Sequence, residues 1–208
     1  MKKKILITAV ICVCVISIAI PLIVAAQGNQ TPKVQVNKDT IDAEDVDLAY
    51  KMSNFTNAAN GGRKRSRTTV MEELITQKIL NVMFIKYNVV LPTDQMDVIE
   101  NSFKEFDANY EKALAGGSQS EIDYMNRLKQ VLDNAQKITE LSKEEFEAYN
   151  IEQSKFILKR SILLKESFGG DVAALEDAVK EIIANGEVEI KTANGQPYQF
   201  KVQLGDIK

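Results

Sequence analysis

Residues 141–146 read Leu-Ser-Lys-Glu-Glu-Phe, and this stretch carries the clearest helix start in the chain. Ser142 has the side chain of an N-cap, and Glu145 follows three residues later, where its carboxylate can reach back to the cap. The apolar residues at the two ends of the stretch can pack together across the first turn. The helix is predicted to continue to Phe168, because the glycine pair at 169–170 then favours a helix end.

Three helices are predicted between residue 69 and this one. Thr69 with Glu72 forms a capping-box pattern before a helix that ends near Tyr87, and Thr93 is the expected cap of a long helix that stops at the glycine pair 116–117. Another helix is expected to start with the capping box of Ser118 and Glu121. The long helix carries apolar residues at helical spacing, namely Met96, Ile99, Phe103, Phe106, Tyr110 and Leu114.

Downstream, Asp171 is the expected cap of a last helix whose inward residues would be Val172, Leu175, Val179 and Ile182. After it the apolar period changes to two on both sides of Asn194-Gly195, which predicts a hairpin over 188–204. Near the other end, residues 34–36 read as a short strand, and Asp42 can cap a helix from Ala43.

Because an isolated hairpin is marginal in water, we expect the C-terminal hairpin to pair with the strand at 34–36. The sequence therefore predicts a mainly α domain over residues 34–208 with a small antiparallel β element. The helical part is closed by the N-terminal strand and the C-terminal hairpin, and a transmembrane helix precedes it.

That transmembrane helix is predicted from residues 5–26, which hold 22 residues without a formal charge after Met1 and three lysines. A helix of this length spans a bilayer, whereas a signal-peptide core needs only about 7 to 15 apolar residues. We therefore divide the chain into an anchor or signal peptide at 1–26, a polar linker at 27–33 and the domain at 34–208.

The lysines at positions 2–4 favour a cytoplasmic N-terminus, which places the domain outside the cell membrane as a single-pass protein. The alternative is cleavage. Small residues end the apolar span at Ala26, and cleavage after Ala26 would release a secreted protein.

Composition excludes several kinds of chemistry. The chain has no histidine, and its two cysteines, Cys12 and Cys14, lie inside the apolar span. The Ser/His and Cys/His nucleophile pairs and the common zinc ligands are therefore missing from the domain. We expect no enzyme activity, no cofactor and no metal. Without Lys2, Lys3 and Lys4, 23 basic residues face 29 acidic ones, a net charge of −6, which argues against nucleic acid as a partner.

Two sets of residues are candidates for binding. The first is the basic run Arg63, Lys64, Arg65 and Arg67, which is either a contact for an anionic surface such as lipid headgroups or cell-wall polymer, or a solvated loop. The second is apolar and either lines a groove for segments of other polypeptides or belongs to the ordinary core. Its members are Met83, Phe84, Tyr87, Met96, Phe103 and Phe106.

The order of residues in the middle of the chain resembles a known family. Residues 70–80, Val-Met-Glu-Glu-Leu-Ile-Thr-Gln-Lys-Ile-Leu, and 87–94, Tyr-Asn-Val-Val-Leu-Pro-Thr-Asp, are similar to the N-terminal domain of SurA- and PrsA-like extracytoplasmic chaperones. Residues 34–41 resemble the opening strand and turn of that domain, and 142–164 its later helix. The resemblance runs in order from Val34 to Phe168.

This resemblance implies a chaperone that holds unfolded or exported polypeptides without ATP. Many members also carry a parvulin prolyl-isomerase domain, for which this chain has neither the length nor a histidine. The expected function is therefore that of a membrane-tethered chaperone module, which binds apolar polypeptide segments reversibly. The alternative is a structural or adaptor protein of the cell envelope that binds one specific partner.

Overall fold

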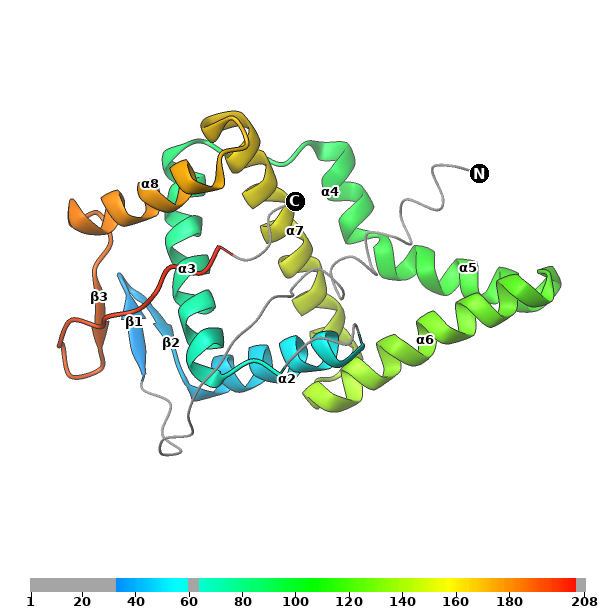
Figure 1. Cartoon of the computed structure of the whole chain (residues 1–208). Coiled ribbons are helices and arrows are strands. Elements are labelled where there is room, and N and C mark those ends of the chain that lie inside the picture. The colour runs from blue at the N-terminus through cyan, green and yellow to red at the C-terminus, as the bar shows by residue number, and fades with distance from the viewer. Residues whose placement is uncertain (1–32, 60–63, 205–208) are drawn as a thin grey trace. The chain divides into compact units, whose positions relative to one another are not determined.

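The computed structural model describes residues 33–59 and 64–204, which form seven helices and three strands (Figure 1). In chain order these are β1 (Val34–Val36), β2 (Asp39–Ile41), α2 (Ala43–Ala59), α3 (Arg67–Lys86), α4 (Thr93–Glu100), α5 (Ser102–Gly116), α6 (Gln119–Thr139), α7 (Lys143–Phe168), α8 (Val172–Ala184) and β3 (Ile190–Thr192). The predicted mainly helical fold with a small antiparallel sheet is confirmed. The predicted membrane span at 5–26 lies outside the described residues, among which no helix is long and apolar enough to cross a bilayer.

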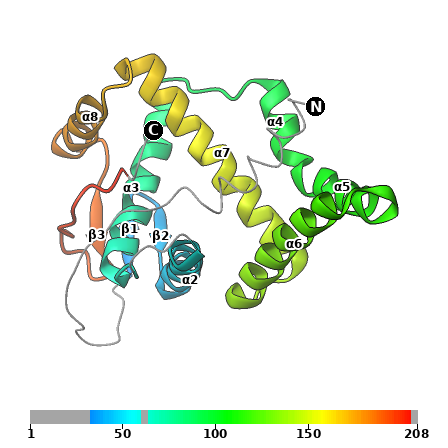
Figure 2. The same ribbon diagram turned by 45° about the vertical axis from the view of Figure 1, so that its right-hand side comes forward.

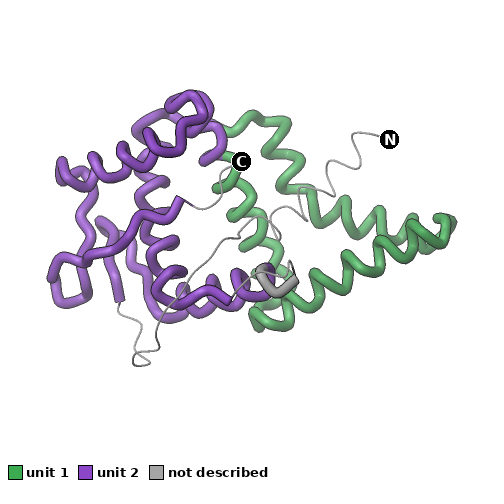
Figure 3. The backbone as a smooth tube through the Cα atoms, in the orientation of Figure 1, with its two compact units in different colours: residues 1–17, 91–158 green, residues 18–90, 159–208 purple. Residues whose placement is uncertain are grey.

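The chain divides into two compact units, drawn in green and purple in Figure 3. Unit 1 comprises Leu91–Leu158 and so contains α4, α5, α6 and the first part of α7. Unit 2 comprises the described residues up to Val90 and those from Lys159 onward. In sequence, unit 1 is thus an insertion between the two halves of unit 2.

The sheet of unit 2 joins residues from the two ends of the described chain. Its strand order is β2-β1-β3, and β1 is antiparallel to both neighbours, with Val36 opposite Asp39 on one side and Ile190 on the other. The predicted pairing of residues 34–36 with the C-terminal strand is therefore confirmed. The strand β2 was not predicted, because the turn residues next to it read as a direct lead into α2.

The C-terminal hairpin is shorter than predicted. After β3 the chain turns at Gly195, whose φ of 75° suits glycine, and an isolated bridge joins Lys191 to Pro197. The prediction of a strand continuing to Leu204 is wrong. Residues 199–204 belong to no strand, because their backbone is held by side chains of α3 instead of a ladder.

Helix α3 is the core of unit 2. It contacts α2, β1 and β2 (Figures 1 and 2), and its buried side chains recur at helical spacing over about four turns. The ring of Tyr87 at its end lies 5.4 Å from the ring of Phe168, and Lys86 pairs with Glu187 at 2.8 Å. The buried residues of α3 are Val70, Met71, Ile75, Thr76, Ile79, Leu80, Met83 and Phe84.

Unit 1 contains an antiparallel pair of helices, α5 and α6, whose buried cluster is Phe106, Ala113 and Met125. The prediction of a single long helix from Thr93 is wrong, because the helix is interrupted at Asn101, between α4 and α5. Side chains there compete for helix carbonyls, since Asn101 Nδ2 donates to Asp97 O at 2.9 Å and Ser102 Oγ donates to Ile99 O at 2.7 Å.

The helix starts follow the predicted caps in most cases. The capping boxes at Ser118 and Ser142 are both present, and Asp171 caps α8 as predicted. The predicted start at Thr69 is wrong, because Ser66 is the cap of α3 and its Oγ accepts from Thr69 N at 3.0 Å. The predicted cap at Thr93 makes no side-chain cap bond, since Thr93 is already inside α4.

Two isoleucines on α3 test whether its buried face carries the stability of unit 2. Ile79 is 0% exposed and Ile85 is 83% exposed, in the same helix. We expect Ile79→Ala to lower the free energy of unfolding by about 2–5 kcal/mol, because it removes buried methyl groups and leaves a cavity. We expect Ile85→Ala to change it by less than about 0.5 kcal/mol. Urea denaturation followed by circular dichroism measures both, and equal effects would contradict the assignment of the core.

The capping box of α6 predicts a pH dependence. Hydrogen bonds from the backbone and side chain of Ser118 hold the pKa of Glu121 below its ordinary 4.5. A lowered carboxyl pKa contributes stability above pH 4.5, and this contribution is lost as the pH falls through the folded-state pKa. Glu121→Ala should therefore be less stable than the unmodified chain at neutral pH, and the gap should shrink in acid. Urea midpoints measured across this range provide the test, and a constant gap would refute the assignment.

Candidate functional site

Three of the six apolar residues predicted to contact polypeptides are buried. Met83 is 0% exposed, Phe84 is 5% exposed and Phe106 is 7% exposed. The first two lie in the core of unit 2, and Phe106 lies in the cluster between α5 and α6. Their prediction as contact residues is corrected here, because a buried side chain has no surface to offer to a partner in this conformation.

The other three predicted residues keep part of their surface. Tyr87, in unit 2, is 39% exposed although its ring packs on Phe168. Met96 and Phe103, in unit 1, are partly exposed, and the Phe103 ring meets the Phe146 ring edge-on at 6.4 Å. Tyr87, Met96 and Phe103 thus remain available as apolar contacts, each within its own unit.

The structure exposes a different set of apolar side chains on α6. Tyr124, Val131 and Ile138 are 47%, 36% and 41% exposed. They follow one another at seven-residue steps, so they form a single stripe about 20 Å long on one side of the helix. We call these three residues the α6 stripe. The turn end of the same helix pair adds Leu114 of α5, which is 52% exposed.

The α6 stripe borders the packed face of its helix. Met125 is buried in the cluster with α5, Leu128 packs against that cluster, and Ala135 is buried on the same side of α6. The apolar arc of α6 is therefore wider than the contact with α5 covers. The stripe was not predicted from the sequence, although its seven-residue repeat of large apolar residues was a signal for it.

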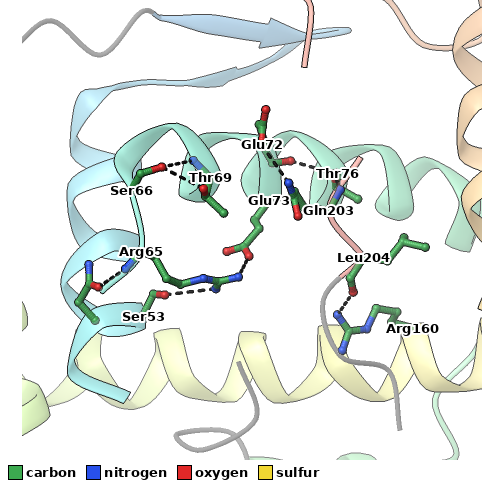
Figure 4. Close-up of polar contacts among 11 residues, drawn as sticks. Ser53, Arg65, Ser66, Thr69, Glu72, Glu73, Thr76, Arg160, Gln203 and Leu204 are labelled. Atoms are coloured by element: carbon green, nitrogen blue, oxygen red, sulfur yellow. Dashed lines mark hydrogen bonds and ion pairs between the residues drawn. The ribbon is translucent and has the colours of Figure 1, made fainter. Parts of the chain in front are cut away.

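The basic run is not a uniformly solvated loop. Arg65 is 9% exposed, and its guanidinium pairs with Glu73 and donates to Ser53 Oγ at 3.2 Å (Figure 4). The amide of Arg65 also donates to Asn54 Oδ1 at 2.7 Å. This arginine therefore ties the segment before α3 to both α2 and α3, and it does not face a surface partner.

The neighbouring basic residues are more exposed. Arg67 pairs with Asp47 and lies over the ring of Tyr50, 4.8 Å from its centroid, and Lys64 lies over the same ring at 5.6 Å. Arg63 lies outside the described residues. Of the predicted anionic-surface contacts, Lys64 and Arg67 are thus the ones that the structure places at the surface.

Within 33–59 and 64–204, no group of three or more His, Cys, Asp or Glu side chains is placed to hold a metal ion. Burial raises the pKa of Tyr149 to about 12, so its phenol stays protonated at neutral pH. The α6 stripe places apolar surface beside a helical core, and such surface is suited to non-covalent binding.

Comparisons of the chain with protein-family models, with curated proteins and with solved structures find no significant match.

The two arginines of the basic run give a matched test of their different roles. Arg65→Ala should lower the free energy of unfolding by about 3–5 kcal/mol, because it leaves the Glu73 carboxylate without its charge partner in a mostly buried place. Arg67→Ala should cost less than about 1 kcal/mol, since its pair with Asp47 is exposed. Urea denaturation measures both. Similar losses for the two variants would contradict the structural role of Arg65.

Proposed function

We propose that the protein is a membrane-tethered, extracytoplasmic chaperone-like protein that binds apolar segments of unfolded or exported polypeptides without ATP or covalent chemistry. The observation that carries the proposal is the α6 stripe, three large apolar side chains at seven-residue spacing that stay 36–47% exposed beside a packed helical core. Soluble proteins seldom keep such rows exposed unless another molecule covers them.

The physical character of the stripe favours many clients over one. Its members offer apolar area and no charge, and burial of such area is non-directional at roughly 25 cal/mol per Å². Because association also costs translational and side-chain entropy, a row of three residues gives weak and reversible binding. These are the properties that a holding chaperone needs.

The predicted membrane anchor and the resemblance to a chaperone family support the remaining parts of the proposal. The uncharged span at 5–26 with its lysine flank supports an anchor with the domain outside the membrane. The resemblance of residues 34–168 to the N-terminal domain of SurA- and PrsA-like chaperones supports the same activity. Secretion after cleavage behind Ala26 is the alternative for its location.

The activity is tested with the full chain in lipid nanodiscs, by light scattering from a reduced and unfolded model protein. We expect the chain to delay aggregation relative to empty nanodiscs. The double variant Val131→Asp/Ile138→Asp should lose most of this delay, because it places two charges in the apolar row. The control is Gln130→Asp, an exposed change of charge on the same helix but off the stripe.

Two outcomes would count against the proposal. If the full chain gave no delay, or if the double variant matched the control while retaining its helical circular dichroism, the α6 stripe would not be a client surface. Photo-crosslinking from position 131 in cells separates the two candidate functions. Many unrelated adducts support a chaperone, whereas one stoichiometric adduct supports the adaptor alternative.

A further inference from the structure

The last described residues form an extended segment that lies on α3. After Pro197 the amide of Tyr198 still donates to Ile190 O at 3.1 Å, and beyond it the chain leaves the sheet. We call residues 198–204 the strap. It belongs to unit 2, as do α3 and the end of α7 that it contacts.

Side chains of α3 hold the strap by its backbone. Lys201 N donates to Glu72 Oε1 at 3.2 Å. Gln203 N donates to Thr76 Oγ1 at 3.0 Å (Figure 4). The Gln203 side chain donates to the second Glu72 oxygen at 3.0 Å. From α7, Arg160 Nη1 donates to the carbonyl of Leu204 at 2.7 Å. Side chains therefore bind both main-chain amides and a main-chain carbonyl of the strap.

The spacing of the two acceptors matches that of an extended chain. Glu72 and Thr76 lie one turn apart on α3, about 6 Å along the axis. Alternate residues of an extended chain lie about 6.6 Å apart, so the amides of Lys201 and Gln203 meet both acceptors in step. Thr76 is itself fixed, because its hydroxyl donates to Glu72 O at 2.8 Å while it accepts from the strap.

The side chains of the strap follow an alternating pattern. Its apolar residues alternate with polar ones, and Leu204 is 7% exposed, while Phe200 and Val202 are partly buried. Alternation lets one face of an extended segment pack on the helices while the other faces water. Main-chain amides are common to all unfolded polypeptides, and segments that form half-buried strands also carry this alternation.

We propose that the Glu72–Thr76 face of α3, together with Arg160, is a binding site for extended polypeptide segments, and that the strap is its resident occupant, which a client displaces. The inference rests on the proposed chaperone function and adds to it a second surface and a form of regulation. Displacement is feasible because the bond from Lys201 N is exposed and the other three are only part-buried, and because the β1–β3 pairing involves residues 190–192 and not the strap.

Hydrogen exchange on the full, unmodified chain tests whether the strap opens by itself. The amides of Lys201 and Gln203 should exchange at least about 100-fold faster than those of β1, because local opening precedes global unfolding in a separable segment. If the strap amides exchanged as slowly as those of the central strand, the strap would be a fixed part of the fold and the proposal would be overturned.

A fluorescent peptide, Tyr-Gln-Phe-Lys-Val-Gln-Leu, tests whether the vacated face binds an extended chain. The peptide should bind the full-length variant Gln203→Pro about tenfold or more tightly than the unmodified chain, because this strap lacks the amide that bonds Thr76 and competes less. A peptide N-methylated at its second Gln should lose binding. The matched control is Gln199→Ala, which changes an exposed glutamine of the strap and leaves the bonds to Glu72 and Thr76 in place.

Equal binding of the peptide to the Pro variant and the unmodified chain, or no binding to either, would refute the site. Equal binding of the N-methylated peptide would refute recognition of the main chain. Circular dichroism verifies that the Pro variant is folded, and if it is not, the exchange experiment on the unmodified chain decides. Neither experiment measures aggregation, so failure of the strap inference and failure of the proposed function remain distinguishable.

Discussion

The buried face of α3 is the constraint on which unit 2 depends. Eight of its residues are buried, and α2, β1 and β2 all contact this one helix. These three elements come from the stretch 34–59 directly before α3, and residues 201 and 203 return to the same helix from the far end of the described chain. Polar contacts also attach neighbouring segments to α3. Arg65 pairs with Glu73 and so holds the segment before the helix, while Glu72 and Thr76 bind the segment after β3.

The local features of the fold were predictable from the sequence where a single turn decides them. Ser118, Ser142 and Asp171 cap their helices as expected, since an N-cap depends on residues at most three positions away. The errors lie where two local options compete. Ser66 caps α3 although Thr69 also had the sequence pattern of a cap. At Asn101 and Ser102 the helix is interrupted, although the apolar spacing continues across them unchanged. The spacing of apolar residues shows which face of a helix is buried, but it does not show where one helix ends and the next begins.

The candidate site was less predictable, because exposure depends on tertiary contacts. Met83 and Phe84 have the same sequence signature as a binding face, yet the sheet and α2 gather around their helix and bury them. Arg65 was hidden within a run of positive charge, and only the approach of α2 and α3 shows that it serves as an interior ion pair. The α6 stripe is the reverse case, in which a modest apolar pattern stays exposed since α5 covers only part of it.

The sheet of unit 2 has a consequence for the order in which the molecule can mature. The bond from Glu189 N to Asn37 Oδ1, beside the pairing of β1 with β3, joins residues 152 positions apart. During vectorial synthesis the first strand emerges long before its last neighbour, whereas the helices of unit 1 have all their partners within one stretch of chain. The helices of unit 1 can therefore assemble early, whereas β1 lacks its second neighbour until residues 190–192 have been made.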